Sequence, residues 1–173
     1  MVARRATSLS AAALTAVAVA AVPAAGQSEK PRPISESPLL WATVNVCDTA
    51  DRPDTIGIRA SMPGSGISAE RMFMRFQVQF FSRTDNRWHN VGRGGDSGFL
   101  AVGSGRYLQR QSGRNFVIKA PTAGGYRLRG AVTFEWRQDG EVVRRARTRT
   151  TSGHGNTRGA DPKGYSRASC IIR

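Results

Sequence analysis

The chain has 173 residues and a formal net charge of +14, from 26 Lys and Arg against 12 Asp and Glu. This length is enough for one domain with a real core. With two cysteines that form no CxxC pair and two histidines, the composition argues against a zinc site or a thiol redox site.

Residues 1–26 have the composition of a helical secretory signal peptide. Arg4 and Arg5 form a charged start, residues 9–22 are an apolar run, and small residues at 23–26 offer a cleavage site. The alternative, a membrane-spanning helix, needs about 20 apolar residues, and this run is shorter. The arginine pair matches twin-Arg export only weakly. We therefore expect a secreted or envelope-associated protein, with no transmembrane anchor once the signal is cleaved.

Residues 27–38 are polar and contain three prolines, which predicts a disordered linker before a domain at residues 39–173. Cys47 and Cys170 lie near opposite ends of that domain, 123 positions apart. In an oxidising compartment, two cysteines at this spacing most simply form one disulfide. Two free buried thiols are the alternative.

From Trp41 onward, apolar and polar residues alternate, which is typical of half-buried β-strands. The segments that follow this pattern, or that lie between turn signals, are residues 41–47, 55–62, 72–82, 87–91, 99–102, 107–109, 115–119, 126–136, 141–150 and 167–172. Residues 92–98 and 151–166 are expected to be loops. The pattern predicts an all-β fold, a single antiparallel β-sandwich of about 7–8 strands.

The segment Pro121-Thr-Ala-Gly-Gly-Tyr126-Arg-Leu resembles the corner before the sixth strand of immunoglobulin-like and fibronectin type III-like domains. The resemblance in architecture covers residues 41–173. It implies that the Tyr126 hydroxyl bonds back to upstream backbone. The cysteines depart from the immunoglobulin pattern, because they would join the first strand to the last instead of the second to the sixth.

The last two long strands meet at Asp139-Gly140. A two-residue turn there would place three arginines against the core, which desolvation forbids without partners. A three-residue loop, residues 138–140, instead pairs Trp136 with Val142 and leaves only Arg144 on the core side, where it can snorkel. We therefore predict the three-residue loop, with Gly140 left-handed in a bulge.

Positive charge is concentrated in residues 101–173, where fifteen Lys and Arg against four Asp and Glu leave a net of +11. In the predicted register, five arginines share the outer face of the last hairpin, and Arg129 lies opposite Arg149. This set, named here the basic ladder, comprises Arg127, Arg129, Arg145, Arg147 and Arg149. A solvated face is the plain interpretation. The functional one is a surface for anionic polymers, with salt-sensitive affinity.

Weaker patterns point to other chemistry. Residues 95–98 (GDSG) copy the surroundings of a chymotrypsin-like nucleophile, but His89 lies only eight positions before Ser97 and lacks the usual context. A calcium site at Asp48, Asp51 and Asp54 is less favoured than a plain turn.

Aromatic side chains add one further alternative. All three tryptophans, Trp41, Trp88 and Trp136, are expected in the core, although an exposed Trp88 would offer a platform for a glycan. Phe73 and Phe81 fall on the polar face of their predicted strand.

These observations predict a secreted, non-enzymatic binding or structural domain at the cell envelope, with no catalytic residue, metal or cofactor. The expected partner is an anionic envelope polymer or a protein, and no specific nucleic acid, since the chain has none of the common recognition motifs. One alternative is a hydrolase that uses carboxylates such as Asp96 or Glu135. Another is an inhibitor or accessory protein that inserts residues 93–105 into a partner.

Overall fold

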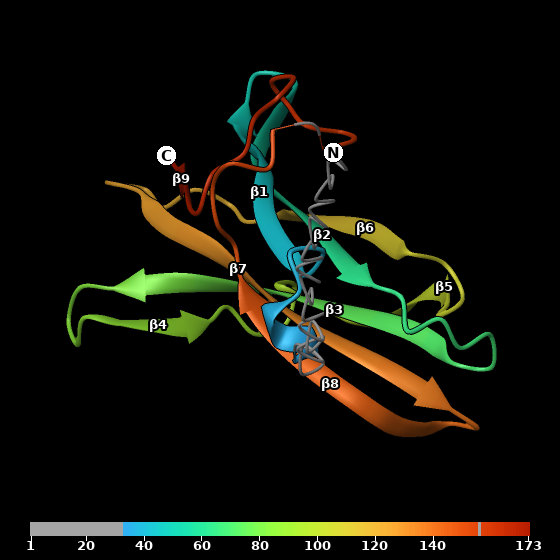
Figure 1. Ribbon diagram of the computed structural model, residues 1–173. Helices are drawn as coiled ribbons and strands as arrows, with labels where there is room; N and C mark the ends of the chain where they lie inside the picture. Colours follow the sequence, from blue (N-terminus) through green and yellow to red (C-terminus); the bar gives the residue numbers. More distant parts are fainter. Residues whose placement is uncertain (1–32, 156) are drawn as a thin grey trace, which may run out of the picture. The chain divides into compact units, whose positions relative to one another are not determined.

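The computed structural model describes residues 33–155 and 157–173, and strands dominate it (Figure 1). The expected signal peptide and the first part of the expected linker lie outside the described residues. Ile34–Glu36 form a short 3-10 helix, η1, and the Ile34 side chain packs against the core. No helix in the described part of the chain is long and apolar enough to span a membrane.

Nine strands run through the described residues, in agreement with the predicted all-β fold. Their bounds are β1 (Trp41–Thr49), β2 (Arg52–Pro63), β3 (Arg71–Ser82), β4 (Arg87–Asn90), β5 (Asp96–Ser104), β6 (Gln109–Val117), β7 (Tyr126–Gln138), β8 (Glu141–Arg149) and β9 (Cys170–Ile172).

The strands form two antiparallel sheets (Figure 1). Sheet A has the order β1-β2-β6. Sheet B has the order β4-β3-β7-β8, with β5 also paired to β3 and β9 to β7. The antiparallel two-sheet architecture predicted from the alternating pattern is confirmed.

The core lies between the two sheets and follows from the period-two pattern. Alternate residues are buried from Met72 to Val78 of β3 and from Leu128 to Trp136 of β7, because they point to the face of sheet B that meets sheet A. Trp136 is 0% exposed, and its indole Nε1–H donates to the Pro63 carbonyl oxygen at 3.1 Å. The largest buried apolar side chains of these strands and of β2 are Ile56, Ile58, Met62, Met72, Met74, Phe76, Phe134 and Trp136.

Cys47 of β1 and Cys170 of β9 form a disulfide, with their Cα atoms 5.4 Å apart. Because β9 pairs with β7, this bond joins sheet A to sheet B. The predicted pairing of the first strand with the last is confirmed.

The β7–β8 hairpin corrects the predicted three-residue loop. Asp139 and Gly140 form a two-residue turn, both with positive φ (52° and 89°), and Gln138 pairs with Glu141. The pairing then shifts at a bulge, so that Trp136 lies opposite Arg144. This extra residue returns the following arginines to the outer face, which is why the tight turn does not bury them.

The bulge also changes the predicted position of Arg149 and the surroundings of Arg144. Arg149 lies opposite Ala131, so the expected direct pairing of Arg149 with Arg129 is wrong. Arg144 does fall on the core side, as predicted, where it forms an ion pair with Glu70, a side chain only 3% exposed.

Three local expectations in the middle of the chain are also wrong. The loop at residues 92–98 ends early, because Asp96 already belongs to β5. Two expected short strands are one continuous strand, β6. Tyr126 is 41% exposed, and the described residues include no hydrogen bond from its hydroxyl to upstream backbone.

Candidate anion-binding face

The outer face of sheet B combines arginines with aromatic rings. The guanidinium carbon of Arg137 lies 4.3 Å from the ring centroid of Phe73 and 4.9 Å from that of Phe99. The guanidinium of Arg129 lies 4.1 Å from the Trp88 ring. Contacts of this kind hold a cation over the electron-rich face of a ring and restrict its motion.

Glu135 neutralises one end of this face. The carboxylate is buried and accepts hydrogen bonds from Arg137 on Oε2 at 2.6 Å and from Arg145 on Oε1 at 2.5 Å. Burial alone would raise the pKa of Glu135, but the hydrogen bonds from Arg137 and Arg145 outweigh it and lower that pKa. Arg145, a member of the basic ladder, is therefore already paired.

Asp96 of β5 is held in the same way by side chains of β3. Arg75 donates from Nε to Oδ1 at 2.9 Å and from Nη2 to Oδ2 at 2.5 Å, and Gln77 donates to Oδ2 at 3.0 Å. The hydrogen bond from Arg75 is the largest cause that lowers the pKa of Asp96 to about 2. This cluster ties β5 to β3.

The Asp96 cluster predicts an acid-dependent loss of stability. Because the pKa of Asp96 is lowered by folding, its stabilisation is complete above about pH 4 and is lost as the pH falls toward about 2. We expect Asp96→Asn to lower the free energy of unfolding by about 1–2 kcal/mol near neutrality, a value reduced for solvent screening. Urea unfolding of both proteins between about pH 7 and 2.5 measures this, and the difference should fall to less than half of its neutral value at the acid end, which still lies above the lowered pKa of Asp96.

Asp139→Asn, at the β7–β8 turn, is the matched control for this series. Asn is favoured at left-handed turn positions, so this variant should keep the stability of the native chain at every pH. A stability deficit of Asp96→Asn that stayed constant down to the lowest pH would contradict the assigned role of the Arg75 ion pair.

Three arginines of the basic ladder converge on one hollow of the surface, called here the sheet B hollow. It has a volume of about 520 Å³. Its described lining residues carry three positive charges and no carboxylate. They are Gln79, Trp88, Arg129, Arg147, Thr148, Arg149 and Thr151.

Arg129 is held in place at the centre of the sheet B hollow. Its Nε donates to Gln79 Oε1 at 2.9 Å, and Gln79 in turn donates to Asn90 Oδ1 at 3.0 Å. Burial, followed by the positive charges of Arg149 and Arg147, lowers the pKa of Arg129. An anion in the hollow would offset this mutual repulsion, and the terminal N–H groups of a stacked, oriented guanidinium suit a phosphate or carboxylate.

The basic ladder is thus divided in the structure. Arg129, Arg147 and Arg149 share the sheet B hollow, whereas Arg145 is bound to Glu135. Arg127 lies opposite Ile171 of β9 and lines a separate hollow of about 390 Å³.

The two residues of the sheet B hollow that contact Arg129 were not predicted to belong to it. Gln79 lies on the polar face of β3, and the sequence does not show that this residue is paired with Arg129 of β7. Trp88 was expected in the core, and this is wrong, since it lies half-buried on the outer face beneath Arg129.

The patterns that suggested other chemistry have structural roles. Ser97 Oγ accepts the backbone N–H of Phe76 at 2.9 Å, whereas His89 Nε2 lies 2.7 Å from Asp85 Oδ2. Asp48 of β1 and Asp54 of β2 accept the backbone N–H groups of Asp54 and Ala120. Among residues 33–155 and 157–173, no three His, Cys, Asp or Glu side chains are grouped so as to hold a metal ion.

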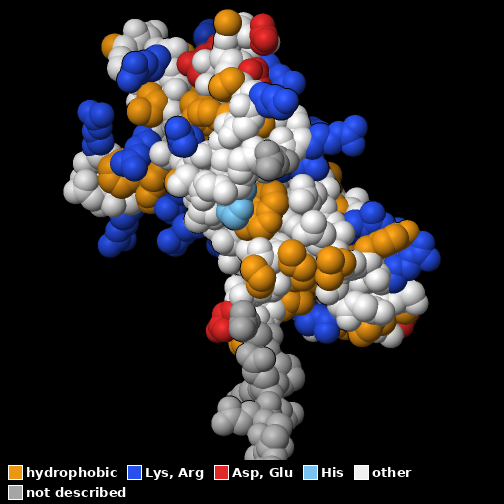
Figure 2. Space-filling view, turned by 45° about the horizontal axis from the view of Figure 1, so that its top comes forward, with side chains coloured by type: hydrophobic (Ala, Val, Ile, Leu, Met, Phe, Trp, Pro, Cys, Tyr) orange, Lys and Arg blue, Asp and Glu red, His pale blue; other side chains and the backbone are white. Residues whose placement is uncertain are grey.

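No protein-family model matches this chain, and no curated protein matches it. The fold and the distribution of charge are therefore the features that indicate an anion-binding site. Figure 2 shows the charge imbalance on one side of the molecule, where many blue Lys and Arg side chains project and few red Asp and Glu side chains are visible.

Proposed function

We propose that this protein is a secreted, non-enzymatic domain that binds anionic polymers or surfaces at the cell envelope through the sheet B hollow. The observation that carries the proposal is the convergence of Arg129, Arg147 and Arg149 on one hollow without a carboxylate among its described lining residues. Guanidinium groups gathered in this way favour repeated phosphate or carboxylate groups.

Export is supported by two independent features of the chain. Residues 1–26 have the composition of a signal peptide. The Cys47–Cys170 disulfide is typical of proteins that fold in an oxidising compartment outside the cytoplasm. Together they favour ligands that lie outside the cell membrane over genomic nucleic acid.

An immunoglobulin-like topology is also proposed, and the strand order supports it. When the strands are lettered in chain order, the spatial orders β1-β2-β6 and β4-β3-β7-β8 correspond to the A-B-E and C′-C-F-G sheets of that fold. The disulfide between β1 and β9 and the exposed Tyr126 depart from it. Domains of this architecture commonly serve binding and not catalysis, which agrees with the proposal only as an analogy of fold.

The two alternative functions receive less support from the same residues. Asp96 and Glu135, the carboxylates considered for a hydrolase, are each bound by arginine, which disfavours a protonated general acid. Most of residues 93–105, considered as an insertion loop, belongs to β5 and pairs with β3.

The proposal is tested with the exported protein and fluorescent inorganic polyphosphate, by anisotropy over a salt series. We expect log K to fall with log salt with a slope of about 2–3, as for about three displaced counterions. Changing Arg129, Arg147 and Arg149 together to Gln should weaken binding at least about thirtyfold at low salt. Poly-glutamate in place of polyphosphate distinguishes carboxylate from phosphate recognition.

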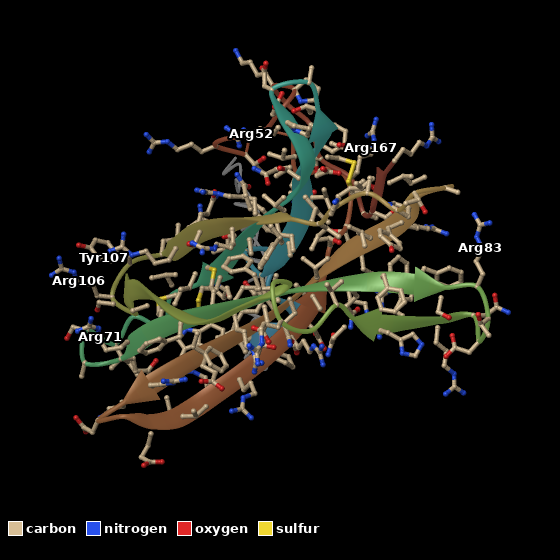
Figure 3. All side chains as sticks on the ribbon, turned by 180° about the vertical axis from the view of Figure 1, so that it is seen from behind. Arg52, Arg71, Arg83, Arg106, Tyr107 and Arg167 are labelled. Carbon is tan, nitrogen blue, oxygen red and sulfur yellow. A yellow bond between two sulfur atoms is a disulfide. The ribbon has the colours of Figure 1, made fainter. Side chains whose placement is uncertain are left out.

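A second triple variant separates the sheet B hollow from general positive charge. Arg71, Arg83 and Arg167 are exposed and lie at separate places on the domain, and none of them lines the sheet B hollow (Figure 3). Changing these three to Gln removes the same charge and should weaken binding less than about threefold. Absence of binding at low salt would overturn the proposal, and equal losses in both triple variants would overturn its site. The same pair of variants is then compared for retention on purified envelope fractions.

A further inference from the structure

A second group of arginines lies on sheet A, away from the basic ladder. It lines a hollow of about 360 Å³, called here the sheet A hollow, and no described lining residue is acidic. A volume near the lower end of the range for small-molecule sites suits a small ligand better than a polymer. The lining residues are Asn45, Arg52, Ile58, Arg59, Gly113, Arg114, Asn115, Arg158 and Gly159.

Two polar atoms of the sheet A hollow are buried without a partner. Among the described residues, neither the Nε of Arg59 nor the Oδ1 of Asn45 has a hydrogen-bond partner. Asn45 is only 5% exposed, and its Nδ2 lies within a long hydrogen bond of the Arg158 carbonyl oxygen, at 3.5 Å, so the unpartnered Oδ1 is assigned as an acceptor. Buried polar atoms normally find partners, so one donor and one acceptor beside the hollow remain unsatisfied among the described residues.

Glycines allow close packing of the strands around the sheet A hollow. Gly113 of β6 lies directly opposite Arg59 of β2, and a Cβ there would lie 2.8 Å from the Ile58 carbonyl oxygen and 3.2 Å from Arg59 Cδ. A Cβ at Gly57 would lie 2.7 Å from Asn115 Oδ1. Both contacts are too close for an unshifted structure, so larger residues would displace the polar side chains that line the hollow.

The electrostatics of the sheet A hollow are also unbalanced. Burial and the nearby positive charge of Arg158 lower the pKa of Arg59. Four arginines line the space and no described carboxylate compensates them. A ligand with two negative charges would offset this repulsion better than a single carboxylate.

We infer that the sheet A hollow binds a small phosphate ligand that also offers a hydroxyl hydrogen. The arginines bind the phosphate oxygens, and the hydroxyl donates to Asn45 Oδ1. Hydrogen phosphate is the simplest such ligand, because it carries both a double negative charge and an O–H group. Sulfate has the same shape and charge but no hydrogen to donate, and it would leave the Asn45 acceptor unpaired. The site does not depend on the sheet B hollow.

The test is isothermal titration calorimetry of the exported protein in a chloride buffer near neutral pH. Inorganic phosphate, glycerol 3-phosphate and sulfate are compared, so that a free phosphate is distinguished from an organic one. We expect one ligand per chain and at least about tenfold tighter binding of the preferred phosphate than of sulfate. Asn45→Ala should remove most of this preference.

Variants locate the binding on sheet A. Arg59→Gln and Arg158→Gln should each weaken phosphate binding about tenfold or more, whereas Arg147→Gln in the sheet B hollow should leave it unchanged. Arg158 is exposed and lies outside the strands, so its variant remains informative even if Arg59→Gln fails to fold. The inference is overturned if no single-site binding occurs, if sulfate binds as tightly as both phosphates, or if Arg158→Gln has no effect.

Discussion

Replacement of both Cys47 and Cys170 by alanine should lower the free energy of unfolding by about 3–5 kcal/mol. The bond closes a loop of 123 positions, and chain-entropy reasoning gives loops of this length the larger values in that range. For a domain of this size, the loss corresponds to a fall in Tm of about 10–15 °C. Thermal unfolding followed by circular dichroism measures it.

Chemical reduction provides the matched comparison for this variant. The reduced native chain should unfold at the same temperature as the double variant, and reduction should not change the variant itself. The mass of thiol-alkylated protein before reduction should show no added label. Two labelled thiols at that stage, or a Tm of the double variant within about 2 °C of the native value, would contradict a stabilising bond.

Trp136→Phe should cost about 2–4 kcal/mol, the second large effect. The smaller ring leaves a cavity among fully buried side chains, and loss of the indole N–H leaves the buried Pro63 carbonyl oxygen without its donor. Urea unfolding should show a lower midpoint with an unchanged slope, because the fold and its buried surface persist.

Trp88→Phe makes the same chemical change on the outer face and serves as the control. Trp88 is half-buried beneath Arg129, and Phe retains part of that stacking. Its cost should stay within about 1 kcal/mol. Similar losses at Trp88 and Trp136 would contradict the assignment of Trp136 to the core between the sheets.

The sequence predicted β3 well because one of its faces is buried and the other is only partly covered. Met74 and Phe76 show the physical reason, since their neighbours Arg75 and Gln77 reach the solvent side and the period of two is then strict. The cost of burying arginine also predicted correctly that Arg145, Arg147 and Arg149 lie on the outer face of β8, although the predicted turn was wrong.

The hairpin register was missed because a bulge leaves little trace in the sequence. Val142 and Val143 are both apolar and both substantially exposed, at 41% and 47%. The alternation of apolar and polar residues therefore gives no sign of the bulge at the point where the pairing shifts. A two-residue turn buries the arginines only if the strand pairing continues without a bulge. A single extra residue in β8 allows the two-residue turn at Asp139-Gly140 and still keeps the arginines on the outer face.

Strand β5 was missed in part because contacts distant in sequence hold it. Local composition at residues 95–98 is that of a turn, yet Asp96 binds Arg75, and Ser97 Oγ accepts the Phe76 N–H. Such contacts override weak strand propensity, and no local pattern reveals them.

The sequence predicted which arginines lie on the outer face, but not which of them share one hollow or which side chains hold them there. Charge and face identified Arg129, Arg147 and Arg149, but the partners that position Arg129 come from β3 and β4. Which strands neighbour one another depends on topology, and the alternating pattern alone does not determine it.

The bond between Cys47 and Cys170 encloses every turn from the β1–β2 hairpin to the segment before β9. A single cut by a protease in any of those turns therefore yields two fragments that remain covalently joined. For an exported domain, as proposed above, such a cut would therefore leave the two fragments joined and would not separate them.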